Sequence, residues 1–221
     1  MRKVITTTFV TLDGVLQAPG GPEEDPTNNF TWGGWIWNYS DELTGKVMDG
    51  FMKQPFDLLL GRRTYEIFAA FWPYTKNDPV IADKFNSTHK YVVSHKGMEL
   101  DWQNSSLITG DVVAEIRKLK AQTGADLWVY GSGNLIQTLL ANQLVDTFYV
   151  WVFPVIIGRG KRLFAEGAKP QGLKLVDSKI STSGVIIATY EPSGEPKTNS
   201  PALEEPGEAE LARRKRLAKE K

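Results

Sequence analysis

Residues 56–71 read FDLLLGRRTYEIFAAF, and this stretch decides the class of fold. Phe56–Leu60 is a short apolar run of the kind that forms a buried strand, and Gly61 ends it. Arg62–Phe71 then carries its apolar side chains at the spacing of one helix face. A second strand, glycine turn and helix follow at 127–142, which read LWVYGSGNLIQTLLAN. Strands that alternate with helices predict an α/β protein with a mostly parallel sheet.

The same criteria extend outward to the rest of the chain. Ser40 is a candidate N-cap for a helix, because Asp41 and Glu42 follow it as acidic first-turn residues. Segments 173–181 and 184–191 flank a turn at Ser183-Gly184, which predicts an antiparallel hairpin at the end of the sheet. The remaining periodicities predict strands at 3–10, 90–94, 105–109 and within 145–157, and helices at 40–53 and 111–122.

Charge and composition exclude several classes of protein. The 221 residues hold 26 basic and 26 acidic side chains, so the surface as a whole is not a phosphate-binding field, and nucleic acid is not an expected partner. No apolar run approaches the roughly 18 residues of a membrane span, and we expect a cytoplasmic protein without a signal peptide. The sequence has no cysteine, which rules out disulfides and cysteine zinc sites, and its two histidines predict no metal site.

The last thirty residues differ from the rest. Residues 192–221 contain four prolines and no Val, Ile, Met or aromatic residue, so they cannot bury enough apolar surface to fold alone. We expect a folded domain at 1–191 and a mixed-charge tail at 192–221, disordered at 192–200 and marginally helical from about Glu204. The basic run Arg213–Arg216 could contact a nucleic acid or a partner, although a solvated tail is favoured.

Three junctions at strand ends carry residues that suit an anionic ligand: Leu60–Thr64, Val93–Gly97 and Tyr130–Leu135. Free amide groups and the dipole at a helix start attract phosphate, and arginine, lysine and hydroxyl groups add hydrogen bonds. Glycines allow the backbone to approach a ligand closely. Each junction has a plainer interpretation as surface charges, an ordinary turn or a solvated loop. The third glycine of the dinucleotide fingerprint is replaced by Ile136.

These motifs, taken in order, resemble the dihydrofolate-reductase-like superfamily. The closest branch is the reductase domain of the bifunctional riboflavin-biosynthesis deaminase/reductase, and the resemblance covers about residues 2–191. The stretches that carry it are Thr11–Gly14, Leu60–Glu66, Gly131–Gly133, Leu139–Leu140, Leu144–Asp146 and Phe153–Phe164. The resemblance implies a mixed sheet of about eight strands flanked by helices, NADPH as cofactor, and a homodimer formed through the late strands. The zinc-dependent deaminase half is not expected, because it needs cysteine.

The resemblance also assigns roles to individual residues. Gly61, Arg62, Arg63 and Thr64 would hold phosphate groups of NADPH, and Ser94, His95 and Lys96 would lie near its 2′-phosphate. Gly131, Ser132, Gly133, Asn134 and Leu135 would line the pyrophosphate and the nicotinamide ribose. Val10 and Leu12 would flank the nicotinamide. Asp13 and the long tryptophan-bearing loop at 12–38, with Trp35, would face the substrate.

Two departures from the dihydrofolate reductase pattern affect the substrate. Those enzymes carry a buried acid on the first helix, whereas Gly45 stands at the aligned position here, with Asp41 and Asp49 a turn away on either side. A folate substrate is therefore not favoured. Asp13 is the first candidate for orienting or protonating the substrate, and water, Asp41 and Asp49 are the alternatives. The glycine pair that is often joined by a cis peptide in the family corresponds to Gly131-Ser132.

The leading hypothesis is an NADPH-dependent oxidoreductase that transfers a hydride to a small heterocyclic or carbonyl substrate. It resembles the 5-amino-6-(5-phosphoribosylamino)uracil reductase of riboflavin biosynthesis. Three alternatives stay open: a non-catalytic nucleotide-binding or regulatory protein on the same fold, a true dihydrofolate reductase, and a phosphate-binding enzyme without redox chemistry.

Overall fold

The computed structural model describes residues 1–164, 166, 168–198 and 205–220. Eight strands form one sheet in the order β4-β3-β2-β5-β1-β6-β8-β7. The strands are β1 (Val4–Thr11), β2 (Phe56–Gly61), β3 (Lys90–Val93), β4 (Ser105–Ile108), β5 (Asp126–Tyr130), β6 (Thr147–Phe153), β7 (Leu173–Ile180) and β8 (Ile186–Pro192). Strands β1 to β6 run parallel, and β8 pairs antiparallel with β6 and β7. The predicted mixed, mostly parallel sheet with an antiparallel C-terminal hairpin is confirmed.

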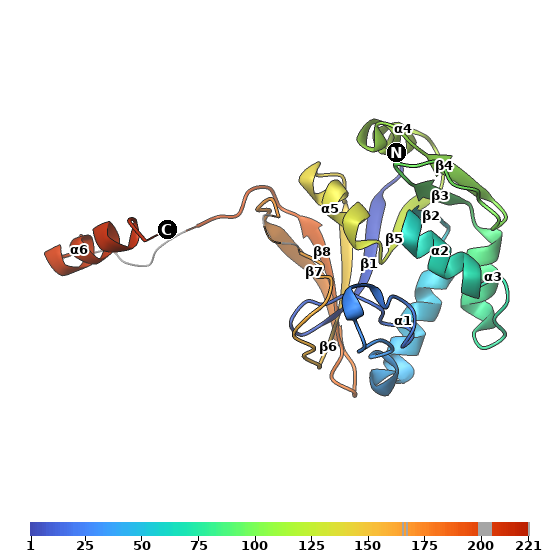
Figure 1. Cartoon of the computed structure of the whole chain (residues 1–221), viewed down its shortest axis with the longest axis horizontal. Helices are drawn as coiled ribbons and strands as arrows, with labels where there is room; N and C mark the ends of the chain where they lie inside the picture. The colour runs from blue at the N-terminus through green and yellow to red at the C-terminus, as the bar shows by residue number, and fades with distance from the viewer. Residues whose placement is uncertain (165, 167, 199–204, 221) are drawn as a thin grey trace.

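Helices cover both faces of the sheet (Figure 1). One core lies under α4 and α5 and contains Ile116, Leu139 and the even-numbered residues Val4 and Val10 of β1. The other core lies under α1, α2 and α3, and residues such as Ile5 fill it. The helices are α1 (Glu42–Met52), α2 (Arg62–Phe71), α3 (Pro79–Ser87), α4 (Val112–Ala121), α5 (Gly133–Ala141) and α6 (Glu208–Leu217), with short 3₁₀ turns η1 (Thr27–Asn29) and η2 (Trp37–Tyr39).

Strand β1 stays paired with β6 over more residues than with β5. The last pair between β1 and β5 is Thr7 with Tyr130, whereas β1 and β6 stay paired as far as Thr11 with Phe153. Since parallel strands end at one edge of the sheet, the segments that follow β1, β2, β3, β5 and β6 meet at this edge.

The structure corrects details of the predicted elements. Asp41, not Ser40, is the N-cap of α1, because its carboxylate accepts from the Thr44 amide and the Thr44 hydroxyl accepts from the Asp41 amide. Helix α3 has no counterpart among the predicted elements, although Asp78 caps it and Pro79 begins it. Strand β6 lies within the apolar run 145–157, as predicted, and ends just before Pro154.

The tail contains one helix. In α6 the described residues bury no side chain, and in Figure 1 the helix lies apart from the sheet. Residues 193–198 form neither helix nor strand. The remainder of the expected linker, 199–200, and both limits of the expected tail helix, 204 and 221, lie outside the described residues.

Candidate functional site

Two helices start side by side at the carboxyl edge of the sheet. Helix α2 follows β2 through Gly61, and α5 follows β5 through Ser132. Within the described part of the chain, neither helix has a side-chain hydrogen bond capping its start. The Gly61 amide donates to the Ser132 hydroxyl oxygen at 2.9 Å, which fixes one helix start against the other. Uncapped first-turn amides and the positive ends of two helix dipoles make this edge a binding place for anions.

The turn between β5 and α5 has the backbone conformation that suits glycine. Gly131 has φ +59°, and Ser132 has φ 64° and ψ 52°, which are both left-handed. A Cβ atom on Gly131 would lie no closer than 4.0 Å to the Thr64 side chain, so the backbone is open there. No cis peptide bond occurs among the described residues, so the Gly131–Ser132 bond is trans. Asn134 is exposed, whereas Leu135 belongs to the core under α5.

The two arginines at the start of α2 point to different partners. Arg62 pairs with Glu66 at 2.7 Å on the exposed surface of the helix. Arg63 turns toward the long loop after β1, where its Nη1 lies 2.9 Å from the Thr27 hydroxyl and 3.4 Å from the Asp25 carboxylate. Arg63 is therefore bound to the long loop, whereas Arg62 is paired within its own helix.

The segment after β3 forms a tight turn with a cationic surface. Ser94 is buried, and its hydroxyl donates to the Lys96 carbonyl at 2.6 Å. This bond closes the turn and leaves His95 and Lys96 exposed. Because β3 lies next to β2 in the sheet, the two exposed side chains follow the strand adjacent to the one that leads into α2.

Val10 near the end of β1 and Leu12 just beyond it differ in accessibility. Val10 is buried in the core under α4 and α5, so its side chain is not presented at the edge. Leu12 is 64% exposed, and its amide donates to the Val155 carbonyl at 2.8 Å. Of the two residues predicted to flank a nicotinamide, Leu12 has the free apolar side chain.

Asp13 anchors the loop after β6. Its carboxylate accepts hydrogen bonds from the Thr11 hydroxyl at 2.6 Å, the Gly158 amide at 2.8 Å and the Ile157 amide at 3.2 Å. Partial burial raises the pKa of Asp13, but these hydrogen bonds outweigh it and lower that pKa below the ordinary value. Arg162 lies 3.7 Å away. An ionised carboxylate held in this way is better suited to positioning than to donating a proton.

The other predicted substrate residues have separate environments. Trp35 is buried, packs edge-on against Phe153 at 5.4 Å, and donates its indole N–H to the Gln17 carbonyl at 3.0 Å. Asp49 is exposed on α1, away from the sheet. The structure therefore does not bring Trp35, Asp41 and Asp49 together around one point.

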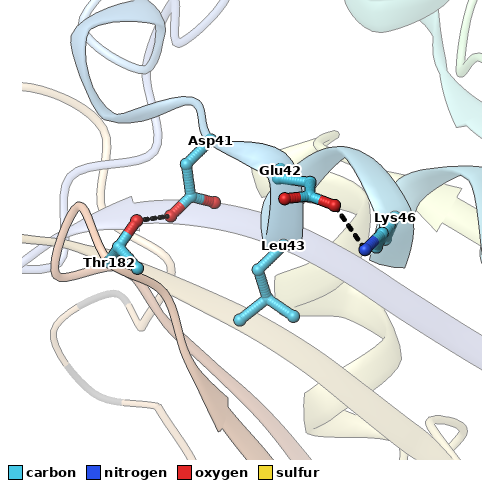
Figure 2. Close-up of a pocket in the computed structure, with 5 residues that line it drawn as sticks. All are labelled: Asp41, Glu42, Leu43, Lys46 and Thr182. Atoms are coloured by element: carbon cyan, nitrogen blue, oxygen red, sulfur yellow. Dashed lines mark hydrogen bonds and ion pairs between the residues drawn. The ribbon is translucent and has the colours of Figure 1, made fainter.

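Figure 2 shows Asp41 and Thr182 pointing toward each other between the start of α1 and the β7–β8 turn. The Asp41 carboxylate accepts from the Thr182 hydroxyl at 2.8 Å and from the Ser183 amide at 3.3 Å. The Thr44 amide and then these contacts hold the pKa of Asp41 far below its ordinary value. The depression beside it, of about 200 Å³, is lined by Asp41, Glu42, Leu43, Lys46 and Thr182. Asp41 thus joins helix and hairpin.

Three buried polar groups escaped the sequence analysis. Among the described residues, the hydroxyls of Thr7 and Tyr130 and the indole N–H of Trp151 make no hydrogen bond of normal geometry, and each residue is at most 6% exposed. Thr7 and Tyr130 are a register pair, and all three lie on the sheet face under α1 to α3. Unpaired polar groups in a core are costly, which marks this face as a place to look for function. The available signal was the polar triplet at 6–8 inside an otherwise apolar strand.

Neither a metal site nor a membrane-spanning helix occurs among the residues that the structure describes. No group of three or more His, Asp or Glu side chains there is placed to hold a metal ion. No helix in the described ranges is long and apolar enough to cross a membrane.

The sheet order, the paired helix starts and the antiparallel finish define a reductase-type fold of the dihydrofolate-reductase kind. The chain belongs to the RibD C-terminal domain family, which it matches over residues 2–187. It is 29% identical over 200 residues to the uncharacterized protein YyaP of Bacillus subtilis, covering 87% of this chain and 96% of that protein. The resemblance predicted from the motifs is thereby confirmed.

Two solved structures share the fold. One is described as a putative riboflavin biosynthesis protein from Shewanella sp. PV-4, with a TM-score of 0.61 and 22% identity over 87% of this chain and 99% of that one. The other is dihydrofolate reductase from Enterococcus faecalis complexed with NADP(H) and RAB-propyl, with a TM-score of 0.56 and 11% identity over 86% of this chain and 96% of that one.

Proposed function

We propose that the protein is an NADPH-dependent oxidoreductase acting on a small heterocyclic or carbonyl substrate, similar to 5-amino-6-(5-phosphoribosylamino)uracil reductase. The observation that carries the proposal is the pair of uncapped helix starts joined by the bond between Gly61 and Ser132. The family match and the NADP(H) complex of the Enterococcus faecalis enzyme support it.

The residues at the sheet edge fit a dinucleotide phosphate. In the proposal, the first-turn amides of α2 and α5 bind the pyrophosphate, because they have no side-chain cap. Arg62 and Lys96, at the ends of adjacent strands, bind the 2′-phosphate. Leu12 packs against the nicotinamide. When bound, NADPH supplies the hydride.

The protein's own task is then to orient the substrate and exclude water. Asp13 stays ionised and fixes the loop after β6. Trp35 packs edge-on against Phe153 at the end of β6 and so holds the long loop against that edge. The hydrogen bonds to Asp13 keep its carboxylate ionised, so the proposal assigns protonation of the substrate to water.

Titration of the purified protein with NADPH and NADH tests the cofactor. We expect tighter binding of NADPH, and we expect Arg62→Ala to reduce the difference between the two dinucleotides. Lys46→Ala is the matched control, because Lys46 pairs with Glu42 on the outer face of α1. Equally weak, millimolar binding of both dinucleotides would refute the assignment. Oxidation of NADPH in the presence of quinones, pterins and pyrimidine intermediates would then identify the acceptor class.

Two alternatives make different predictions. A dihydrofolate reductase needs an acid facing the sheet from α1, but Asp41 caps the helix and Asp49 is exposed. We therefore expect no turnover of dihydrofolate. A non-catalytic nucleotide-binding protein would bind NADPH without oxidising it for any acceptor in the panel, and the positioning contacts of Asp13 are the observation that favours it.

We further propose a homodimer formed through the late strands. Leu175 and Ile180 of β7 pair with Tyr190 and Ile186 of β8, which places them on the sheet face shared with α4 and α5. Leu175 is 51% and Ile180 is 71% exposed, and a second copy would cover them. Ile180→Glu should shift the sedimentation coefficient to that of a monomer, while Lys179→Glu on the opposite face should leave it unchanged.

A further inference from the structure

The long loop after β1 is organised around a buried glutamine. Gln17 is 2% exposed, and its amide donates to the carbonyls of Asp25 at 2.9 Å and Thr27 at 3.0 Å. Its side-chain oxygen accepts from the Lys161 amide at 3.1 Å. These bonds tie the segment 15–30 to the segment after β6, so its position is set by specific contacts.

Within this segment, Asp25 holds two cations from distant parts of the chain. Its side chain is 10% exposed, and its carboxylate pairs with Lys161 and lies 3.4 Å from the guanidinium of Arg63. The Thr27 hydroxyl lies 2.9 Å from both cations and also contacts Asp25. Burial raises the pKa of Asp25, but the hydrogen bond from Lys161 and those from Thr27 outweigh it, so the pKa is lowered and Asp25 is an anion.

One of these cations belongs to the candidate phosphate site. Arg63 is the second residue of α2, whose uncapped start faces the start of α5. Its side chain is 45% exposed, so the carboxylate covers only part of the guanidinium. The Asp25 carboxylate therefore pairs with a cation at the start of α2, the helix whose first-turn amides bind the pyrophosphate in the proposed function.

We propose that Asp25 is a positioning residue that competes with a ligand phosphate for Arg63. Asp25 keeps the segment 15–30 attached to Arg63 and Lys161 until a phosphate takes over the guanidinium, after which Asp25 stays on Lys161 alone. The proposal rests on the proposed function for the identity of the ligand. The shared chemistry is a phosphate ester or anhydride, from a nicotinamide dinucleotide or from free pyrophosphate.

The test compares Asp25→Asn with a control that removes the same charge from the same loop. Glu23→Gln is that control, because Glu23 is exposed and has no hydrogen bond or ion pair within the described ranges. Calorimetric titration with NADPH, and separately with pyrophosphate, should show affinity rising about threefold to fivefold in Asp25→Asn, the worth of one partly exposed charge pair. The fold-change in affinity that Glu23→Gln produces should be less than half of the fold-change in Asp25→Asn.

A second pair of variants isolates the contact to Arg63. In an Arg63→Ala background, Asp25→Asn should no longer raise the affinity for either ligand, because the shared cation is absent. Asp25→Ser provides the same comparison with a shorter side chain, should the asparagine amide stay bound to Lys161. Hydrogen exchange of residues 15–30 without ligand should be faster in Asp25→Asn than in the wild type.

The outcomes separate the two proposals. An equal gain in Asp25→Asn and Glu23→Gln, a gain that persists in the Arg63→Ala background, or weaker binding in Asp25→Asn would each overturn the competition. Tight NADPH binding that Asp25→Asn leaves unchanged would overturn it too, with the proposed function intact. A gain seen for pyrophosphate, with no NADPH binding in any variant, would uphold the competition and refute the proposed function.

Discussion

Ser132 contributes two opposing terms to the stability of the site, and two substitutions separate them. Its hydroxyl accepts the Gly61 amide at 2.9 Å, while its backbone has a left-handed conformation with φ 64°. Loss of the hydrogen bond costs about 1 kcal/mol, and the left-handed conformation costs a residue with a Cβ about 1 kcal/mol. Ser132→Ala loses the bond and keeps the strain. Ser132→Gly loses the bond and relieves the strain.

We therefore expect Ser132→Ala to lower the free energy of unfolding by about 1 kcal/mol, and Ser132→Gly to leave it within about 0.5 kcal/mol of the wild type. For a chain of this size the alanine variant should melt about 2–4 °C lower. Urea unfolding with unchanged m-values measures both effects. Equal destabilisation by the two substitutions would contradict the strain argument. No effect of either would show that the hydroxyl does not hold the helix starts together.

Three further predictions concern stability. Burial lowers the pKa of the fully buried Lys90 from 10.5 to about 8, so between pH 8 and 10.5 the unfolded chain binds more protons than the folded one. The free energy of unfolding should therefore rise by up to about 3 kcal/mol over that range. Urea unfolding of Lys90→Met should lack this rise. Thr7→Val should leave stability unchanged or higher, since its hydroxyl has no partner, and a clear loss in urea unfolding would indicate a partner. Asp41→Ala should lower Tm at pH 7, while Asp49→Ala should not. The Tm difference between Asp41→Ala and the wild type should shrink as the pH falls from 3.8 toward the lower folded-state pKa of Asp41, because the carboxylate is then protonated.

The parts of the fold that depend on local pattern were predictable. The run at 56–71 predicted β2 and α2, and the turn at Ser183-Gly184 predicted the hairpin, because burial periodicity and glycine conformations act over a few residues. Helix α3 was not predicted, although Asp78 and Pro79 form a helix start signal. The choice of Ser40 over Asp41 failed because capping depends on the hydroxyl of Thr44, three residues further on.

The contacts within the candidate site were less predictable. Asp25, Arg63 and Lys161 are separated by tens of residues, and only the folded sheet brings them together. A basic motif in the sequence says that Arg63 is a cation, but not that a carboxylate of the same chain already holds it. Trp35 was predicted to face a substrate because it is an aromatic residue in a long loop. The folded loop buries Trp35, and its contact with a substrate stays a prediction.

The early end of β5 has a consequence for how a bound molecule would be recognised. Beyond Thr7, strand β1 has β6 on one side and no paired strand on the other. Alternate residues of a parallel strand direct their amide and carbonyl to opposite neighbours, and the Thr7 carbonyl accepts from the Gly131 amide on the β5 side. The main chain of Phe9 therefore faces the side that β5 has left. Recognition by that main chain would be insensitive to the identity of the side chains around it, so homologous proteins with different pocket residues could retain it.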